Sequence, residues 1–179
     1  MKSVRVFLTG EPGVGKTTII HKVVQELQSR GIMVGGMTSG EIRMGGSRVG
    51  FQVEDISTHE VGELAKLGQT FPGAPRVGRY GVNLADVERV GVAAIRRALK
   101  VANVVIVDEI GPMELKSSQF VLAMEDALAS TKNLLGTLHR RTIHPLTNAI
   151  RTNSDYQVIE VTPVNRNRIE PQVTSLFVC

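Results

Sequence analysis

Residues 7–20, FLTGEPGVGKTTII, decide the fold. The stretch matches the pattern G-x-x-x-x-G-K-[ST], with Gly10, Gly15, Lys16 and Thr17 in register. Glycines have no Cβ atom, so the backbone of such a loop can turn its N–H groups inward and form a nest for anions. The lysine adds a point charge for the terminal phosphates, and the threonine hydroxyl is a ligand for Mg²⁺. The pattern predicts a loop that binds a chain of phosphates.

The residues on either side of this loop support the same interpretation. Residues 4–10 before it are mostly apolar, as in a buried strand. Apolar residues then recur with helical spacing over residues 16–29, and Gly31 stands where a C-terminal cap is expected. Strand, loop and helix follow one another as they do in phosphate-binding loops. We expect nucleotide contacts from Gly10, Glu11, Pro12, Gly13, Val14, Gly15, Lys16, Thr17 and Thr18.

The composition is typical of one globular domain, which we assign to residues 1–179. Hydrophobic residues make up 42% of the chain, and the formal net charge is +4. The basic residues are scattered and aromatic residues are only 4%, so nucleic acid is not an expected partner. The only cysteine is Cys179, which excludes an internal disulfide. No signal-peptide layout or membrane-spanning apolar run is present, so we expect a cytoplasmic location.

After the first helix, the sequence predicts a β-hairpin and then a variable region. β-type residues flank the turn signal MGGS and predict a hairpin over residues 32–55. Residues 58–68 have the pattern of a short helix. Residues 69–83 are rich in glycine and proline and predict a long loop, a type of segment that often acts as a lid.

The second half alternates between helix and strand patterns. Helices are predicted over residues 84–100, with Asn83 as N-cap, and over residues 117–130; shorter ones are predicted to begin at Pro145 and Pro171. Strands are predicted over residues 103–111, 133–139 and 156–162. Together with the phosphate loop (P-loop), this alternation predicts an α/β fold with a mostly parallel central sheet, helices on both faces and a β-hairpin extension. Ligands of such sheets bind at the carboxyl ends of the strands.

A second motif, VVIVDEI, ends one of these strands with two acids. Asp108 is placed to hold the water shell of Mg²⁺, which makes Thr17 and Asp108 the expected metal ligands. Glu109 is placed to accept a proton from an attacking water or to orient that water. The pair therefore indicates hydrolysis rather than binding alone. The predicted nucleotide-binding segment here is Val104, Val105, Ile106, Val107, Asp108, Glu109, Ile110 and Gly111.

Several further side chains are candidates for contacts with the nucleotide. In GTLH, Thr137 or His139 can contact the γ-phosphate or the water, although a histidine at a strand end is also often an ordinary hydrogen-bonded residue. We place His139 with Lys16 and Glu109 among the expected catalytic residues. Asn165 or Arg166 can lie beside the base. The sequence leaves open which arginine contacts the phosphates; the candidates are Arg43, Arg76, Arg79, Arg140 and Arg141.

Taken together, these motifs resemble those of the THEP-type, cancer-related nucleoside-triphosphatase family. The resemblance rests on TGEPGVGKTT, GEIRMGGSRVGF, RVGRYGVN, VDEIGPMEL, GTLHRR and VTPVNR, which extend over nearly the whole chain. The chain has GTLH where the family typically has ATVH or ATIH, which leaves the histidine in place. The resemblance implies the α/β P-loop NTPase fold and slow, Mg²⁺-dependent hydrolysis of nucleoside triphosphates with loose base selectivity. It implies no physiological role.

Two other functions use the same motifs. A nucleoside or nucleotide kinase would share the loop and the Mg²⁺ site but would need a second pocket for an acceptor, with residues 68–82 as a possible lid. A nucleotide-operated switch would bind an unknown protein partner. Glu109 favours water as the acceptor, although kinases also place acids at this position.

Overall fold

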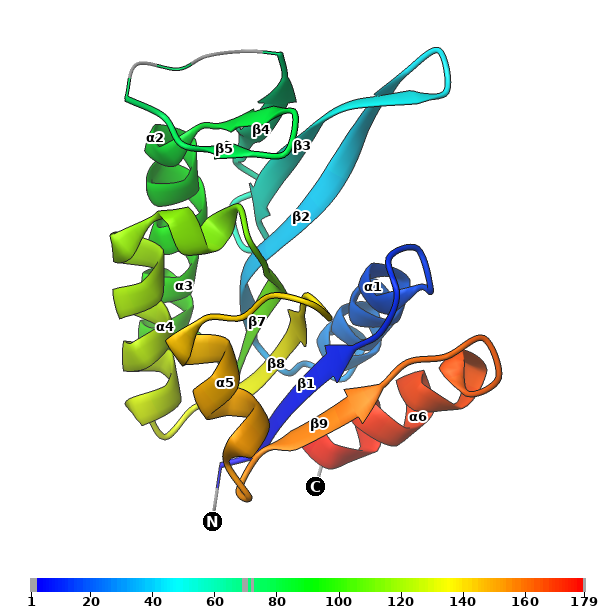
Figure 1. The fold of residues 1–179 in the computed structure, drawn as a ribbon. Helices are drawn as coiled ribbons and strands as arrows, with labels where there is room; N and C mark the ends of the chain where they lie inside the picture. The colour runs from blue at the N-terminus through cyan, green and yellow to red at the C-terminus, as the bar shows by residue number, and fades with distance from the viewer. Residues whose placement is uncertain (1–2, 69–70, 72, 179) are drawn as a thin grey trace.

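The computed structural model describes residues 3–68, 71 and 73–178, and its central sheet is covered by helices on both faces (Figure 1). The strands are β1 (Arg5–Thr9), β2 (Val34–Met44), β3 (Ser47–Asp55), β4 (Val61–Leu67), β5 (Arg76–Val77), β6 (Tyr80–Val82), β7 (Val104–Ile110), β8 (Asn133–Leu138) and β9 (Gln157–Glu160). The helices are α1 (Lys16–Ser29), α2 (Leu84–Asp86), the π-helix η1 (Val87–Val92), α3 (Ala93–Val101), the 3₁₀-helix η2 (Glu114–Lys116), α4 (Ser118–Ala129), α5 (Pro145–Thr152) and α6 (Arg166–Phe177).

The nine strands in the described part of the chain form one sheet of order β5-β6-β4-β3-β2-β7-β8-β1-β9. From β2 to β9 every neighbouring pair is parallel. From β2 to β5 every pair is antiparallel, and the β2–β3 hairpin projects beyond the rest of the sheet (Figure 1). The predicted fold class, a parallel α/β core with a hairpin extension, is confirmed.

Two hydrophobic cores hold the helices on the sheet. One core joins the sheet to η1, α3, α4 and α5, and the other joins it to α1 and α6. Strand β7 contributes to both, because successive side chains of a strand point to opposite faces. Val105 and Val107 lie in the first core, and Val104 and Ile106 lie in the second. This burial on both faces is typical of a central parallel strand.

The helix predicted over residues 58–68 is wrong, because this segment contains strand β4. Its glutamate, lysine, leucine and alanine favour a helix when isolated, but β3 offers a strand edge that residues 61–66 pair with. Leu64 and Ala65 are buried in the first core. At Gly62, an added Cβ would lie 3.0 Å from side-chain atoms of Asp86 and Val90, so the strand packs closely on the helical segment behind it.

The predicted long loop and the predicted last helix also differ from the structure. Residues 76–82 form β5 and β6 and extend the sheet, with Val82 fully buried, while residues 69, 70 and 72 of the supposed lid lie outside the described part of the chain. The last helix begins at Arg166 rather than Pro171, which lies inside it. Its start follows a turn in which the N–H groups of Asn165 and Arg166 donate to the carbonyl of Thr162.

The other predicted elements are confirmed to within a few residues. Asn83 caps the helical segment that follows it, since its side chain accepts a hydrogen bond from the N–H of Asp86. Within the described ranges, no helix has both the length and the apolar composition required to cross a bilayer.

Candidate active site

The phosphate loop joins the end of β1 to the start of α1 at the carboxyl edge of the sheet. Gly10, Gly13 and Gly15 have φ angles of 143°, 77° and 112°, in the left-handed region that favours glycine. A Cβ on Gly10 would lie 2.5 Å from the carbonyl oxygen of Val161, so there is no room for a side chain at that position. The sequence pattern and the backbone geometry therefore agree at this loop.

Lys16 folds back across the loop. Its side chain is only 8% exposed, and Nζ donates to the carbonyl oxygens of Gly10 at 3.0 Å and Glu11 at 3.2 Å. Its positive charge opposes the rise in the pKa of Glu109 and contributes to a lowered pKa of His139. The ammonium group therefore acts on both of the other expected catalytic residues.

Asp108, at the end of β7, has a carboxylate oxygen suited to a cation. The residue is 1% exposed, and Oδ1 accepts a hydrogen bond of 2.5 Å from the hydroxyl of Thr137 on β8. Oδ2 is buried and has no hydrogen-bond partner among residues 3–68, 71 and 73–178. Burial raises the pKa of Asp108, and the hydroxyls of Thr137 and Thr17 act in the opposite direction. The expected metal ligands, Thr17 and Asp108, are thus neighbours, and their oxygens are of the kind that Mg²⁺ prefers.

Glu109 follows Asp108 and is partly buried. Burial is the main cause that raises its pKa to about 7, the charge of Asp108 raises it further, and the charge of Lys16 lowers it. A carboxyl group with a pKa near neutrality is suited to exchange protons at physiological pH. Among the other members of the predicted segment, Val104 to Val107 and Ile110 lie in the cores and serve to place the two acids.

A third acid at this edge, Glu114, was given no role by the sequence analysis. It lies in η2, its side chain is 4% exposed, and burial raises its pKa to about 8. The charges of Glu109 and Asp108 also raise its pKa. The only signal in the sequence was its place in VDEIGPMEL, which cannot show that the chain turns back and buries this carboxyl group.

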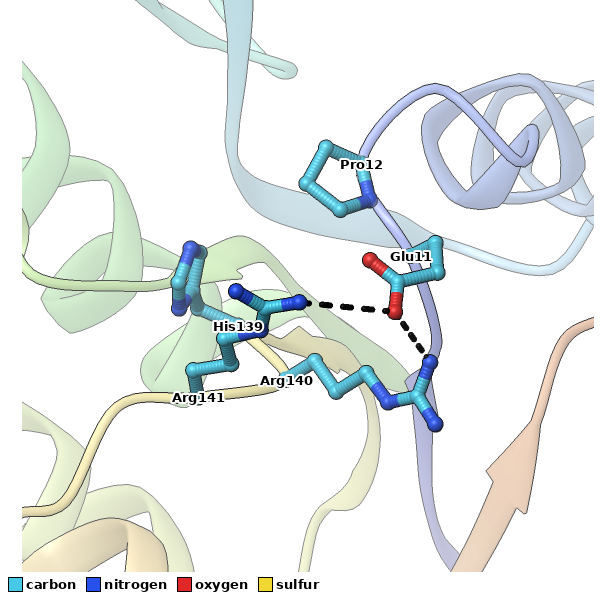
Figure 2. Close-up of a pocket in the computed structure, with 5 residues that line it drawn as sticks. All are labelled: Glu11, Pro12, His139, Arg140 and Arg141. Carbon is cyan, nitrogen blue, oxygen red and sulfur yellow. Dashed lines mark hydrogen bonds and ion pairs between the residues drawn. The ribbon is translucent and has the colours of Figure 1, made fainter.

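His139, Arg140 and Arg141 lie beside the phosphate loop and, with Glu11 and Pro12, line a hollow of about 270 Å³ (Figure 2). Arg140 forms ion pairs with Glu11 and, at 3.2 Å, with Glu160, while Arg141 lies 3.9 Å from Glu11. The ring Nδ1 of His139 is 2.8 Å from the hydroxyl of Thr142. Burial and the charges of Lys16, Arg151 and Arg141 lower the pKa of His139, which favours the neutral ring.

Arg151, on α5, was also missed by the sequence analysis. Its guanidinium donates to the carbonyl of His139 at 2.8 Å, to that of Thr142 at 3.0 Å and to that of Arg140 at 3.4 Å. One side chain therefore fixes the backbone of the turn that carries the hollow's basic residues. Nothing in the local sequence distinguishes it from a surface arginine on the last turn of a helix.

The remaining arginine candidates lie on the antiparallel half of the sheet. Arg43 is paired with Glu41 at 2.6 Å near the tip of the β2–β3 hairpin. Arg76 donates to the carbonyl of Arg79 at 3.3 Å. Of the five candidates, Arg140 and Arg141 are the two that line the hollow beside the phosphate loop.

A second hollow of about 390 Å³ extends from the loop to the start of α6, and Arg166 is part of its lining. The Arg166 side chain reaches to 4.0 Å from the position of a Cβ on Gly15. Asn165 instead uses its amide within its own turn: Nδ2 donates to the carbonyl of Glu160 at 2.8 Å, and Oδ1 accepts from the N–H of Thr162 at 2.7 Å. Of the two residues expected beside the base, only Arg166 therefore presents its side chain to this hollow.

Comparison with known proteins identifies the family of this chain. The sequence matches the profile of the family described as NTPase over residues 5–174. Nucleoside-triphosphatase THEP1 of Thermofilum pendens is 46% identical over 174 residues, which cover 97% of this chain and 94% of that protein. The protein of the same name from Pyrococcus abyssi is 44% identical over 169 residues, 94% of this chain and 89% of its own length.

Two solved structures share the fold. The crystal structure of THEP1 from the hyperthermophile Aquifex aeolicus superposes with a TM-score of 0.85 at 31% identity and covers 98% of this chain and 100% of that one. The solution structure of a human cancer-related nucleoside triphosphatase has a TM-score of 0.83 at 38% identity and covers 98% of both chains. The phosphate loop, the buried acids and these relatives together show that the chain belongs to the NTPase family, among the THEP1-type nucleoside-triphosphatases.

Proposed function

We propose that this protein hydrolyses nucleoside triphosphates to nucleoside diphosphates and inorganic phosphate, with Mg²⁺ as the metal and water as the acceptor. The observation that carries the proposal is the meeting of two motifs: Lys16 and Thr17 of the phosphate loop act electrostatically on Glu109 and Asp108 of β7. A phosphate-binding loop with an acid beside it has the groups needed to bind a triphosphate and to activate water. The names of the relatives from Thermofilum pendens and Pyrococcus abyssi describe the same activity.

Binding is assigned to the loop and the metal ligands. The inward N–H groups of the loop and the ammonium group of Lys16 would hold the β- and γ-phosphates. Thr17 and Asp108 would hold Mg²⁺, and the buried, unpartnered Oδ2 of Asp108 supports this assignment. When bound, the ion neutralises the negative charge that develops on the phosphate oxygens.

Water activation is assigned to Glu109. Its carboxylate takes a proton from the attacking water, the oxygen of that water forms a bond to the γ-phosphorus, and the bond to the β–γ bridging oxygen breaks. The nucleoside diphosphate leaves with the electron pair of that bond. A pKa of about 7 leaves the group partly ionised at neutral pH and basic enough to accept the proton.

Turnover is proposed to be slow and base selectivity low. Arg140 and Arg141 pair with Glu11, so either would first have to leave this ion pair to stabilise transition-state charge as an arginine finger does. The amide of Asn165 is hydrogen-bonded to the backbone of its own turn. The second hollow, where we place the base, is instead partly lined by the exposed side chain of Arg166. An arginine stacks on the face of any base, whereas strong discrimination requires buried polar groups that reject the wrong base.

The test is to incubate the protein with ATP and Mg²⁺ alone and to measure phosphate release. Release without any acceptor is expected; transfer that occurs only when a nucleoside or nucleotide is added would indicate a kinase instead. Glu109→Gln should retain ATP–Mg²⁺ binding but release phosphate roughly 10²–10⁴-fold more slowly, because an amide cannot take the proton. Glu125→Gln, on the exposed face of α4, is the matched control and should keep the parent rate.

A further inference from the structure

The proposed mechanism leaves one buried acid unused, Glu114. A buried carboxyl group is costly unless its oxygens are hydrogen-bonded. The backbone N–H groups of Glu114 itself and of Gly111 stabilise this carboxyl group. These contacts fix the Glu114 side chain against the short turn that connects β7 to η2. Its position is therefore set by the turn that directly follows the strand carrying Asp108 and Glu109.

Glu114 and Glu109 converge on Gly111. A Cβ built on Gly111 would lie 2.9 Å from Oε1 of Glu109 and 3.0 Å from Oε2 of Glu114. Oxygens of both carboxyl groups therefore lie within 3.0 Å of one point beside Gly111. The two side chains are close enough for the charge of Glu109 to raise the pKa of Glu114.

Glu114 is suited to support a neighbouring carboxylate. Burial raises its pKa to about 8, so at neutral pH it carries a proton. A protonated carboxyl group is a hydrogen-bond donor, and hydrogen bonds to a charged acceptor are among the stronger ones in proteins. Glu109, by contrast, accepts protons in the proposed mechanism and needs a fixed orientation to do so.

The segment that carries Glu114 is anchored at its far end as well. Ser117 follows η2 and caps α4, since its hydroxyl oxygen accepts from the N–H of Phe120 at 3.1 Å. The same hydroxyl donates to Glu88 of η1 at 2.8 Å. A side chain on such a braced segment can hold its neighbour in one orientation.

We propose that Glu114 is a positioning residue for water activation: its carboxyl group, fixed on the turn after β7, holds the Glu109 carboxylate in the orientation that accepts a proton from water. This inference rests on the proposed function, because it assigns Glu109 to that step.

The test compares Glu114→Leu with Glu114→Gln. Leucine has a similar size and suits a buried site but cannot donate a hydrogen bond, so the variant should stay folded and lack only the proposed hydrogen bond from Glu114 to Glu109. Glutamine keeps the length and a donor. Leucine should lower kcat about 10- to 100-fold, in line with the loss of one strong hydrogen bond, with KM for ATP within about threefold of the parent. Glutamine should recover most of the loss in kcat. Glu125→Leu, on the exposed face of α4, is the matched control.

Two further measurements separate positioning from a general structural role. In the Glu109→Gln background, Glu114→Leu should cause no further loss of kcat, because Glu114 acts through Glu109. In unfolding of the nucleotide-free protein, the effects of the two substitutions should be non-additive, because the side chains are neighbours.

Three results would overturn the inference. They are a folded Glu114→Leu variant with the parent kcat, a Glu114→Gln variant as slow as Glu114→Leu, or full additivity of Glu109→Gln and Glu114→Leu in their effects on kcat or on the free energy of unfolding. In any of these cases a slow Glu109→Gln variant would leave the proposed function intact. A Glu109→Gln variant that turns over at the parent rate would instead overturn the proposed function, and the role of Glu114 with it.

Discussion

Replacing Glu114 by glutamine should flatten the pH dependence of stability of the nucleotide-free protein. Burial, assisted by the charges of Glu109 and Asp108, raises the pKa of this carboxyl group from its ordinary value of 4.5 to about 8. The folded state therefore holds the proton more tightly than the unfolded state. The stabilisation that results is complete below pH 4.5 and is lost as the pH rises towards about 8.

The size of the effect follows from the width of this window. Within it, each pH unit changes the free energy of unfolding by at most about 1.4 kcal/mol for one such group. Between pH 5 and pH 7, the parent should lose roughly 3 kcal/mol more than Glu114→Gln. Glu109, with a pKa of about 7, remains in both proteins and leaves a slope in the variant as well.

The assay is urea unfolding without nucleotide at several pH values and one ionic strength. The free energies of unfolding of the parent and of Glu114→Gln should converge at acidic pH and separate as the pH rises, with the variant more stable at pH 7. Glu125→Gln, an exposed acid on α4, should follow the parent. Parallel curves for the parent and Glu114→Gln would refute the reasoning, because they would show that Glu114 has an ordinary pKa in the folded protein.

Three other substitutions and one substrate panel give further tests. Lys16→Ala should abolish detectable turnover and weaken triphosphate binding, while Lys22→Ala on the exposed face of the same helix should not. Arg151→Met should lower kcat/KM about tenfold or more, because it releases three backbone carbonyls of the turn beside the phosphate loop. Arg30→Met, at the far end of α1, is the control and should keep the parent kcat/KM. Equal values of kcat/KM for the two variants would contradict the role of Arg151 in fixing this turn. Gly10→Ala should lose nucleotide binding measured by fluorescence, because its Cβ would collide with a backbone oxygen. Across ATP, GTP, CTP and UTP, kcat/KM should vary within about an order of magnitude, and a preference above roughly a hundredfold would reveal a specific base pocket.

The parallel half of the fold was predictable because its signals are local. The phosphate loop requires glycines and a lysine at fixed spacing, and the helix after it was predicted over the residues it occupies, Lys16–Ser29. A buried parallel strand that ends in acids, such as β7, is equally visible in the sequence. The topology then brings Thr17 next to Asp108, although they are 91 positions apart in the chain.

The antiparallel half of the sheet and the roles of Glu114 and Arg151 were not predictable, because they depend on contacts between segments far apart in the sequence. Strand β4 has the residue preferences of a helix and becomes a strand because β3 offers a pairing edge. Glu114 and Arg151 resemble surface residues in a local window. Glu114 is buried by the turn that follows β7, and the Arg151 side chain on α5 reaches three backbone carbonyls of the turn beside the phosphate loop.

The central claim is that this site transfers the γ-phosphoryl group to water, with Glu109 as the base. Hydrolysis of ATP and Mg²⁺ in oxygen-18 water, with mass analysis of both products, tests it most directly. The account predicts oxygen-18 in the released phosphate and none in the nucleoside diphosphate, with the same labelling but a far lower rate for Glu109→Gln. Label in the nucleoside diphosphate, or no phosphate release until a second acceptor is added, would contradict it.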